Sequence, residues 1–163
     1  MMSLEYLKHV KGDLLQLARE GYFNVIVHGC NCFCTMGSGI AKQIKQEYPK
    51  AYEADCATVK GSVDKLGTYS VMHGEQFDIV NAYTQYSYNR YDQPKNDCFD
   101  YESFSKILRS LSRNYKGCNF GFPYIGMGLA GGDKDVIIAQ LEMFTLIVKL
   151  GGGTVTLVEY SKD

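Results

Sequence analysis

The sequence has no excess of basic residues. Lys and Arg together number 17 and Asp and Glu number 18, which gives a formal net charge of -1 at pH 7. Proteins that bind nucleic acid regardless of its sequence depend on a basic surface that neutralises phosphates. The charge balance therefore excludes that class of protein, and we expect no nucleic-acid partner.

Long apolar runs are also absent. No stretch approaches the roughly 20 apolar residues that a membrane-spanning helix needs. The N-terminal residues alternate between polar and apolar types and contain no hydrophobic core of a secretory signal peptide. We therefore expect no membrane association and an intracellular, cytoplasmic protein.

The paired cysteine motifs of structural zinc sites are missing, although the chain has 6 cysteines. Cys30, Cys32 and Cys34 alternate with single residues close to His28. Structural zinc sites space a cysteine pair by two to four residues and add a second, distant pair. No second pair exists here, and a disulfide scaffold is not expected in a chain of this length without a secretory signal. We expect buried, reduced thiols, no metal and no cofactor.

Strand and helix patterns alternate along the chain. A length of 163 residues, with 45% hydrophobic and 21% charged residues, suits one globular domain, and we assign residues 1–163 to it. The sequence has no repeats, low-complexity tracts or linkers. The alternation predicts an α/β fold with helices on both faces of a sheet.

The expected elements follow from apolar periodicity and turn residues. The strands at 66–72 and 77–84 are expected to form a hairpin, and 85–100 a polar, tyrosine-rich surface loop. Strands are predicted at 4–10, 25–27, 66–72, 77–84, 118–122 and 154–158. Helices are predicted after Asp13, from residue 40 to Pro49, within 50–66, and at 100–114 and 134–150.

The stretch 24–45 organises the rest of the chain. A short β-branched run at 25–27 predicts a buried strand. The glycine-rich turn Gly37-Ser38-Gly39 then leads directly into a helix with one apolar face. A strand followed by such a turn aims several backbone N–H groups at one point, which favours an anion such as a phosphate or diphosphate.

A second glycine-rich segment, residues 123–133, also follows a buried strand and precedes a helix. Loops at the carboxyl ends of strands line the ligand crevice of open α/β sheets, so both segments are expected to face one cleft. The first segment matches neither the dinucleotide-binding G-x-G-x-x-G nor the phosphate-binding GxxxxGK[ST] pattern, and the second does not match GxxxxGK[ST]. Taken alone, each is a weak signal for a phosphate site, because glycine clusters in α/β proteins usually just make tight turns.

Taken together, these segments resemble the macro domain, an ADP-ribose-binding α/β module. The resemblance is greatest to stand-alone macro domains that process ADP-ribose 1''-phosphate, and to the related subgroup that removes ADP-ribose from acidic side chains. It implies a three-layer α/β/α fold with a mixed central sheet. The matching pieces, in order, are Lys11-Gly-Asp-Leu14, Val27-His-Gly-Cys-Asn-Cys32, Met36-Gly-Ser-Gly-Ile-Ala41, Val80-Asn-Ala-Tyr-Thr-Gln85 and Pro123-Tyr-Ile-Gly-Met-Gly-Leu-Ala-Gly-Gly-Asp133.

The resemblance also implies a set of ligand-binding residues. Asp13 is similar to the aspartate that accepts a hydrogen bond from the adenine amino group, and a helix N-cap is an equally good and compatible role for it. Asn31 and its neighbours are similar to the segment that closes over the distal ribose. The glycine loops are similar to those that cradle the diphosphate through backbone N–H groups. The full implied set is Gly12, Asp13, Leu14, Gly29, Cys30, Asn31, Met36, Gly37, Ser38, Gly39, Ile40, Ala41, Tyr124, Ile125, Gly126, Met127, Gly128 and Leu129.

His28 and Asp133 are the candidate catalytic residues. His28 stands where the phosphatase-like group carries histidine and most macro domains carry asparagine. It can protonate a leaving oxygen or orient the scissile phosphate, and the alternative is a histidine hydrogen-bonded in the core. Asp133 can attack the substrate or activate water, and the alternative is the N-cap of the helix that starts at Lys134.

The chain departs from the subgroup that forms a covalent lysyl intermediate, which carries a lysine just after the fourth strand. Here that segment is Thr84-Gln85-Tyr86-Ser87, the nearest downstream cation is Arg90, and Lys95 lies further along the loop. A lysine-adduct mechanism therefore does not fit. Four tyrosines in and just before the loop can stack on adenine, form a lid or only cover a sheet edge: Tyr83, Tyr86, Tyr88 and Tyr91.

The expected function is binding of ADP-ribose and hydrolysis of ADP-ribose 1''-phosphate to ADP-ribose and phosphate. Two alternatives within the family are a non-catalytic ADP-ribose reader and a hydrolase that removes ADP-ribose from acidic protein side chains. A redox or metal protein built on the cysteines is a more remote one. The expected partner is the small-molecule ligand, with ADP-ribosylated protein and poly(ADP-ribose) left open.

Overall fold

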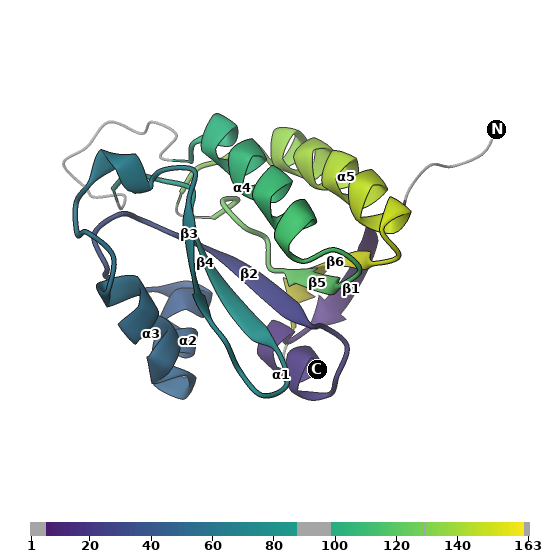
Figure 1. Cartoon of the computed structure of the whole chain (residues 1–163), viewed down its shortest axis with the longest axis horizontal. Helices are drawn as coiled ribbons and strands as arrows, with labels where there is room; N and C mark the ends of the chain where they lie inside the picture. The colour runs from purple at the N-terminus through teal and green to yellow at the C-terminus, as the bar shows by residue number, and fades with distance from the viewer. Residues whose placement is uncertain (1–5, 88–98, 129, 162–163) are drawn as a thin grey trace.

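The computed structural model describes residues 6–87, 99–128 and 130–161. A six-stranded sheet with the order β1-β6-β5-β2-β4-β3 lies between two layers of helices (Figure 1). The strands are β1 (Lys8–Gly12), β2 (Val25–Cys30), β3 (Tyr69–Met72), β4 (Asp78–Tyr83), β5 (Asn119–Phe122) and β6 (Thr154–Tyr160). The helices are α1 (Leu14–Arg19), α2 (Gly39–Glu47), α3 (Pro49–Cys56), α4 (Tyr101–Asn114) and α5 (Lys134–Leu150), with a short 3-10 helix at Val63–Lys65.

The sheet is mixed, as expected. Strand β3 pairs antiparallel with β4 and forms the predicted hairpin, whereas the other strand pairings are parallel. Helices α4 and α5 cover one face and α1, α2 and α3 the other (Figure 1). The three-layer α/β/α prediction is therefore confirmed. Among the described residues, no helix combines the length and apolar character needed to cross a membrane.

Strand β2 lies in the interior of the sheet, between β5 and β4, and both of its faces are apolar. Val25 and Val27 pack in the cluster under α4 and α5, whereas Ile26 packs in the cluster under α1, α2 and α3. Successive side chains of a strand point to opposite faces, so a continuous β-branched run suits a strand covered on both sides. Its parallel neighbours β4 and β5 supply the backbone hydrogen bonds.

Two predicted elements differ in detail. The first strand is predicted at 4–10 but is found at Lys8–Gly12, because its register with β6, from Lys8 opposite Thr156 to Gly12 opposite Tyr160, sets its extent. Residues 1–5 lie outside the described residues. Pro49 not only follows the end of α2 but also begins α3 at the first helical position, where a missing N–H costs nothing.

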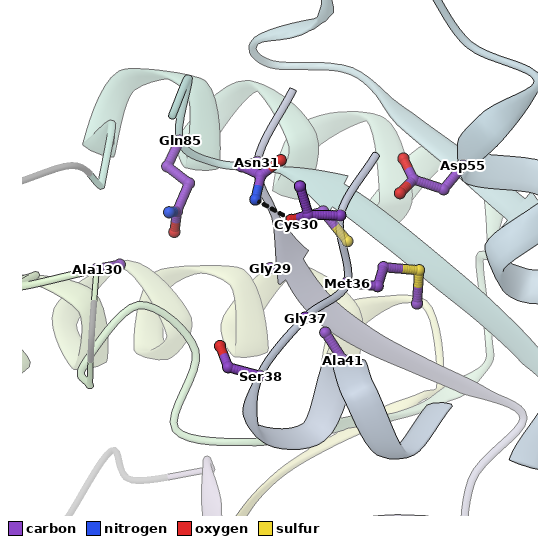
Figure 2. Close-up of a pocket in the computed structure, with 11 residues that line it drawn as sticks. Gly29, Cys30, Asn31, Met36, Gly37, Ser38, Ala41, Asp55, Gln85 and Ala130 are labelled. Atoms are coloured by element: carbon purple, nitrogen blue, oxygen red, sulfur yellow. Dashed lines mark hydrogen bonds between the residues drawn. The ribbon is translucent and has the colours of Figure 1, made fainter. Parts of the chain in front are cut away.

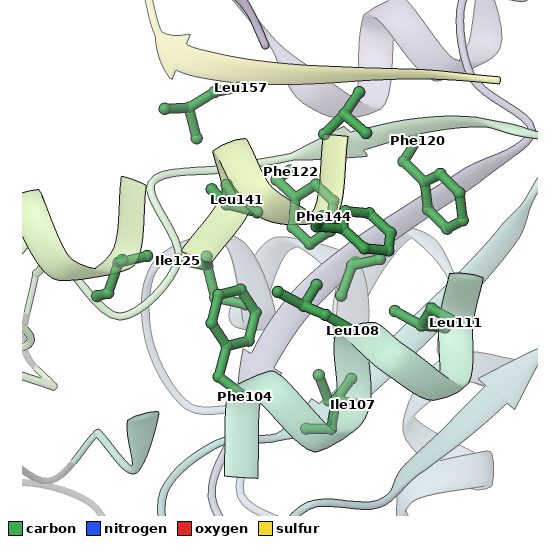
Figure 3. Packing of buried hydrophobic residues seen from close by; sticks show 14 of the residues in the cluster. Phe104, Ile107, Leu108, Leu111, Phe120, Phe122, Ile125, Leu141, Phe144 and Leu157 are labelled. Atoms are coloured by element: carbon green, nitrogen blue, oxygen red, sulfur yellow. The ribbon is translucent and has the colours of Figure 1, made fainter. Parts of the chain in front are cut away.

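An aromatic cluster joins β5 to the α4–α5 layer (Figure 3). The rings of Phe120 and Phe144 have centroids 5.1 Å apart and an interplanar angle of 76°, a favourable edge-to-face arrangement. Phe120 also meets the rings of Phe122 and Tyr115. Because β5 leads directly into the second glycine-rich segment, this cluster positions that segment.

Replacing Phe120 with alanine is expected to lower the free energy of unfolding by about 3–5 kcal/mol, because a fully buried ring with three aromatic neighbours leaves a cavity. Urea unfolding followed by circular dichroism measures the loss. Tyr22→Ala is the matched control, since Tyr22 is 64% exposed and should change stability by less than about 0.5 kcal/mol. Equal losses in the two variants would contradict this account of the core.

Candidate functional site

A cavity of about 420 Å³ lies at the end of β2 (Figure 2). We call it the Cys30 cavity. Most of its wall comes from the end of β2, the turn before α2 and the first turn of α2. Helix α3, the segment after β4 and the second glycine-rich segment contribute one residue each. The lining residues are Gly29, Cys30, Asn31, Thr35, Met36, Gly37, Ser38, Ala41, Asp55, Gln85 and Ala130.

A second cavity of about 400 Å³, which we call the Asp13 cavity, lies on the other side of the start of α2. Its lining residues are Gly12, Asp13, Leu14, Gly39, Ile40, Gln43, Pro123, Tyr124, Val158 and Tyr160. Ser38 and Ala41 line the Cys30 cavity while Gly39 and Ile40 line this one, so the first turn of α2 borders both. An extended ligand can therefore occupy the two cavities with its middle at that turn.

Both cavities open at the carboxyl ends of parallel strands. Gly12 ends β1, Cys30 ends β2, Tyr160 ends β6, and Gln85 and Pro123 follow β4 and β5 closely. Parallel strands end at the same edge of a sheet, where α/β proteins bind their ligands. The two glycine-rich segments thus contribute to one region, as their position in the sequence predicts.

The turn from β2 to α2 is held by the side chain of Asn31. Its amide oxygen accepts from the Phe33 N–H at 2.8 Å, and its amide nitrogen donates to Thr35 Oγ1 at 2.7 Å. Asn31 therefore lines the cavity while both ends of its amide are engaged within the turn. Cys34 and Met36 adopt φ values of 58° and 42°, which non-glycine residues rarely adopt, and such backbone strain concentrates at functional loops.

Two glycines permit close packing around the Cys30 cavity. A Cβ on Gly29 would lie 2.9 Å from Thr84 Oγ1, so no side chain fits at this point of β2. A Cβ on Gly132 would lie 2.7 Å from the carbonyl oxygen of Gly126, which accepts a 2.7 Å hydrogen bond from the Gly132 N–H. This hydrogen bond brings Gly126 and Gly132 together and so closes a compact loop within the second glycine-rich segment.

Most of the implied ligand-binding residues line one of the two cavities, and a few do not. From the second segment, Tyr124 lines the Asp13 cavity and Ala130, which the prediction omitted, lines the Cys30 cavity. Leu129 lies outside the described residues. Those that line neither cavity are Ile125, Gly126, Met127 and Gly128.

Asp13 has the geometry for both of its predicted roles. Its Oδ1 accepts from the Gln16 N–H at 3.1 Å, which confirms the N-cap of α1, and the residue also lines the Asp13 cavity. The apolar wall around it includes Ile40, Val158 and the ring of Tyr124. A mostly apolar pocket with one carboxylate suits a flat ring that carries a hydrogen-bond donor.

His28 lies in the core and lines neither cavity. It is 1% exposed, and its Nε2 is 2.6 Å from Asn81 Oδ1. Since the Asn81 amide nitrogen donates to Ala51 O and Ser70 Oγ, the Asn81 oxygen accepts and the His28 Nε2 carries the proton. Burial lowers the pKa of His28 to about 4, so the ring is neutral at neutral pH. The structure therefore shows the alternative arrangement, a hydrogen-bonded core histidine.

Asp133 is the N-cap of α5, as its alternative assignment predicts. Its Oδ1 accepts from the N–H groups of Asp135 at 2.9 Å and Val136 at 3.3 Å. Asp133 is exposed and lines neither cavity, although it lies only three residues beyond Ala130. A catalytic role for it remains a prediction.

Sequence reasoning missed several cavity-lining side chains, of which Asp55 is the most notable. The segment 50–66 has weak apolar patterning, and nothing in it indicates that Asp55 is buried against the end of β4. Tyr83, at the end of β4, donates from its hydroxyl to Asp55 Oδ1 at 2.7 Å. Thr35 and Tyr160 were missed because turn and strand-end residues carry no periodic pattern, and Gln43 because it is a polar residue in the middle of α2.

The thiol of Cys30, which lines the cavity, is not activated as a nucleophile. The five that the structure describes are free thiols, and burial raises the pKa of the Cys30 thiol well above its usual range. A protonated thiol is a weak nucleophile. Within the described residues, no group of three or more His, Cys, Asp and Glu side chains is arranged to hold a metal ion.

The lowered pKa of His28 makes stability depend on pH. Between about pH 4 and 6.5 the unfolded chain binds a proton at His28 that the folded protein does not, so this stabilisation is complete above pH 6.5 and declines as the pH falls towards 4. The expected loss between neutral pH and pH 4 is about 3 kcal/mol. Urea unfolding across this range should show a steeper decline for the wild type than for His28→Gln.

His9→Gln is the control for this measurement, because His9 is exposed. It should follow the wild-type pH dependence of unfolding. A His28→Gln protein with the wild-type slope would show that His28 is not a buried neutral group.

The sequence matches a known protein family and several known proteins. A family model for the macro domain matches residues 27–140. An uncharacterised 17.5 kDa protein of Enterobacteria phage T4 is 37% identical over 85% of this chain and 90% of its own length. An ADP-ribose 1''-phosphate phosphatase of Aspergillus oryzae is 40% identical over a shorter region, 38% of this chain and 31% of that protein.

The fold is also similar to that of solved structures. Thermosipho africanus DarTG in complex with ADP-ribose superimposes with a TM-score of 0.72 at 16% identity, covering 97% of this chain and 43% of that one. The identity is too low for this similarity to bear on more than the fold. The family model and the phage relative, which extend over most of the sequence, show that the chain belongs to the macro domain family.

Proposed function

We propose that this protein binds ADP-ribose across the two cavities and hydrolyses ADP-ribose 1''-phosphate to ADP-ribose and phosphate. The observation that carries the proposal is the first turn of α2, which borders the Asp13 cavity on one side and the Cys30 cavity on the other. Adenine occupies the Asp13 cavity, the diphosphate lies at the start of α2, and the distal ribose enters the Cys30 cavity.

The start of α2 suits a diphosphate because its cap is incomplete. Ser38 is the N-cap residue but makes no side-chain hydrogen bond to the first turn. By contrast, Asp13 and Asp133 each accept from the first turn of their own helix. Uncapped N–H groups and the positive end of the helix dipole favour an anion at that point.

Hydrolysis of the 1''-phosphate is supported by the relatives named ADP-ribose 1''-phosphate phosphatase. Gln85 lines the Cys30 cavity where the lysyl-adduct subgroup is expected to carry lysine, and its amide nitrogen donates to Ser87 O at 2.9 Å. None of the described residues that line this cavity is a lysine. The removal of ADP-ribose from acidic side chains through a lysine adduct therefore fits less well than phosphate release.

A reader without catalytic activity is the second candidate function. It is favoured by one observation, that neither Asp133 nor His28 lines the Cys30 cavity. Incubation with ADP-ribose 1''-phosphate and, in parallel, with mono-ADP-ribosylated protein separates the candidates. Phosphate release supports the proposal, release of ADP-ribose from protein supports the deacylating hydrolase, and tight binding with neither product indicates a reader.

Asp13→Asn is expected to weaken ADP-ribose binding about ten-fold or more without lowering stability. The Asn oxygen can still accept from the Gln16 N–H and cap α1. The other carboxylate oxygen is replaced by an amide N–H₂ group, which cannot accept a hydrogen bond from the adenine amino group. Calorimetry should show the opposite effect for the hypoxanthine analogue of ADP-ribose, whose ring carries an oxygen in place of the amino group. Equal changes for the two ligands would remove Asp13 from base recognition.

Asp133→Asn is expected to reduce phosphate release at least about 100-fold while ADP-ribose affinity stays within a few-fold. Asn preserves the helix cap, so the effect isolates the loss of the carboxylate, whereas Asp133→Ala should also lose about 1 kcal/mol of stability. Asp100→Asn, the same change at the cap of α4, is the matched control. Full phosphate release by Asp133→Asn would exclude Asp133 from catalysis.

A further inference from the structure

The inner end of the Cys30 cavity holds a carboxylate that is only half satisfied. Asp55 is 1% exposed and lines the cavity from the C-terminal turn of α3. Its Oδ1 accepts from the Tyr83 hydroxyl at 2.7 Å, while its Oδ2 is buried and receives no hydrogen bond from any described group. Figure 2 shows the carboxylate pointing from α3 toward Cys30.

The protein holds Asp55 rigidly in this position. Its main-chain oxygen accepts from Thr58 Oγ1 at 2.6 Å and from Cys34 Sγ at 3.3 Å, which ties the end of α3 to the turn before α2. The Tyr83 hydroxyl, held in turn 2.8 Å from Ser70 Oγ, holds one oxygen of the carboxylate in place. Oδ2 therefore cannot gain a partner simply by rotation of a loose side chain.

The ammonium group of Lys65, a positive charge near Asp55, interacts with other groups. Lys65 is buried, its ammonium donates to Cys32 O at 3.1 Å, and it lies 4.5 Å from the centre of the Tyr83 ring. Among the described residues it makes no ion pair with Asp55. A buried carboxylate oxygen without a donor is costly, so this atom favours a ligand that brings one.

The two ends of the Cys30 cavity thus favour opposite chemistry. The start of α2, at Ser38, favours an anion, whereas Asp55 repels an anion and accepts hydrogen bonds. In Figure 2, Gln85 and Ala130 lie on the opposite side of Cys30 from Asp55. A ligand that fits this arrangement presents a phosphate to α2 and a hydroxyl to Asp55.

We propose that Asp55 is a specificity-determining residue whose free Oδ2 accepts a hydrogen bond from a hydroxyl of the sugar bound in the Cys30 cavity. This inference rests on the proposed function, because that sugar is the distal ribose of ADP-ribose. The charge of Asp55 also excludes a phosphate from the inner end of the cavity. The 1''-phosphate of the substrate is therefore directed toward the side of Gln85 and Ala130, where the second glycine-rich segment lies.

The test compares ADP-ribose with ADP, which lacks the distal ribose, by calorimetry on wild type and Asp55→Asn. In the variant the Tyr83 hydroxyl still donates to Oδ1, but Oδ2 is replaced by an N–H₂ donor. ADP-ribose affinity is expected to fall roughly 10- to 100-fold, the usual effect of losing a hydrogen bond to a charged group, and ADP affinity to change less than about two-fold. Asp64→Asn, an exposed acid in the 3-10 helix, is the matched control and should change neither.

Each other outcome has a defined meaning. Equal weakening of both ligands, or no change in either, overturns the role of Asp55 and leaves the proposed function intact. A wild-type protein that binds no ADP-ribose overturns both. If Asp55→Asn does not fold, as judged by its circular dichroism, Asp55→Ala supplies the same comparison of ADP-ribose with ADP.

Discussion

A chain of buried and half-buried hydrogen bonds connects the centre of the sheet to the cavity. The Nε2 of His28 on β2 donates to the Asn81 oxygen on β4, and the Asn81 amide nitrogen donates to Ser70 Oγ on β3 at 3.0 Å. The Ser70 hydroxyl lies 2.8 Å from the Tyr83 hydroxyl, which donates to Asp55 on α3. Because each buried polar group needs the next one, this chain fixes how α3 sits against three strands. The position of the cavity wall follows from it.

The protonation states along this chain support the same arrangement. Burial lowers the pKa of His28, which keeps the ring neutral, and raises the pKa of the Tyr83 hydroxyl, which keeps its proton available for Asp55. The residue that resembled a catalytic acid is therefore the first member of a structural network. Its last member, Asp55, has the oxygen that the network leaves without a donor. Among the members of this network, the unsatisfied oxygen therefore belongs to the residue that lines the Cys30 cavity.

Sequence patterns predicted the parts of the fold that depend on local periodicity. The helix at 134–150 has the predicted bounds, because its apolar pattern begins after the cap Asp133 and ends before Gly151. The glycine-rich segments lie at one edge of the sheet because strand-to-helix order determines that edge. Strand alternation also explains His28, which shares a face with Ile26 and so points into the layer under α1, α2 and α3. Asp55 could not be predicted, because its burial depends on tertiary contact with Tyr83 and not on any pattern within its own helix.

In the proposed complex, backbone groups and side chains recognise different parts of the ligand. The first turn of α2 offers backbone N–H groups, which any glycine-rich macro-type loop can supply, so that turn explains binding of a diphosphate but not the choice among its derivatives. In the proposed complex that choice falls to the side chains at the far ends: Asp13 in the cavity proposed for the base, and Asp55 and Gln85 in the cavity proposed for the sugar. A carboxylate on one side of Cys30 and a neutral amide on the other make the cavity asymmetric in charge. In this proposed arrangement an anionic substituent on the ribose is therefore directed away from Asp55 and toward the second glycine-rich segment, the part of the wall nearest in sequence to Asp133.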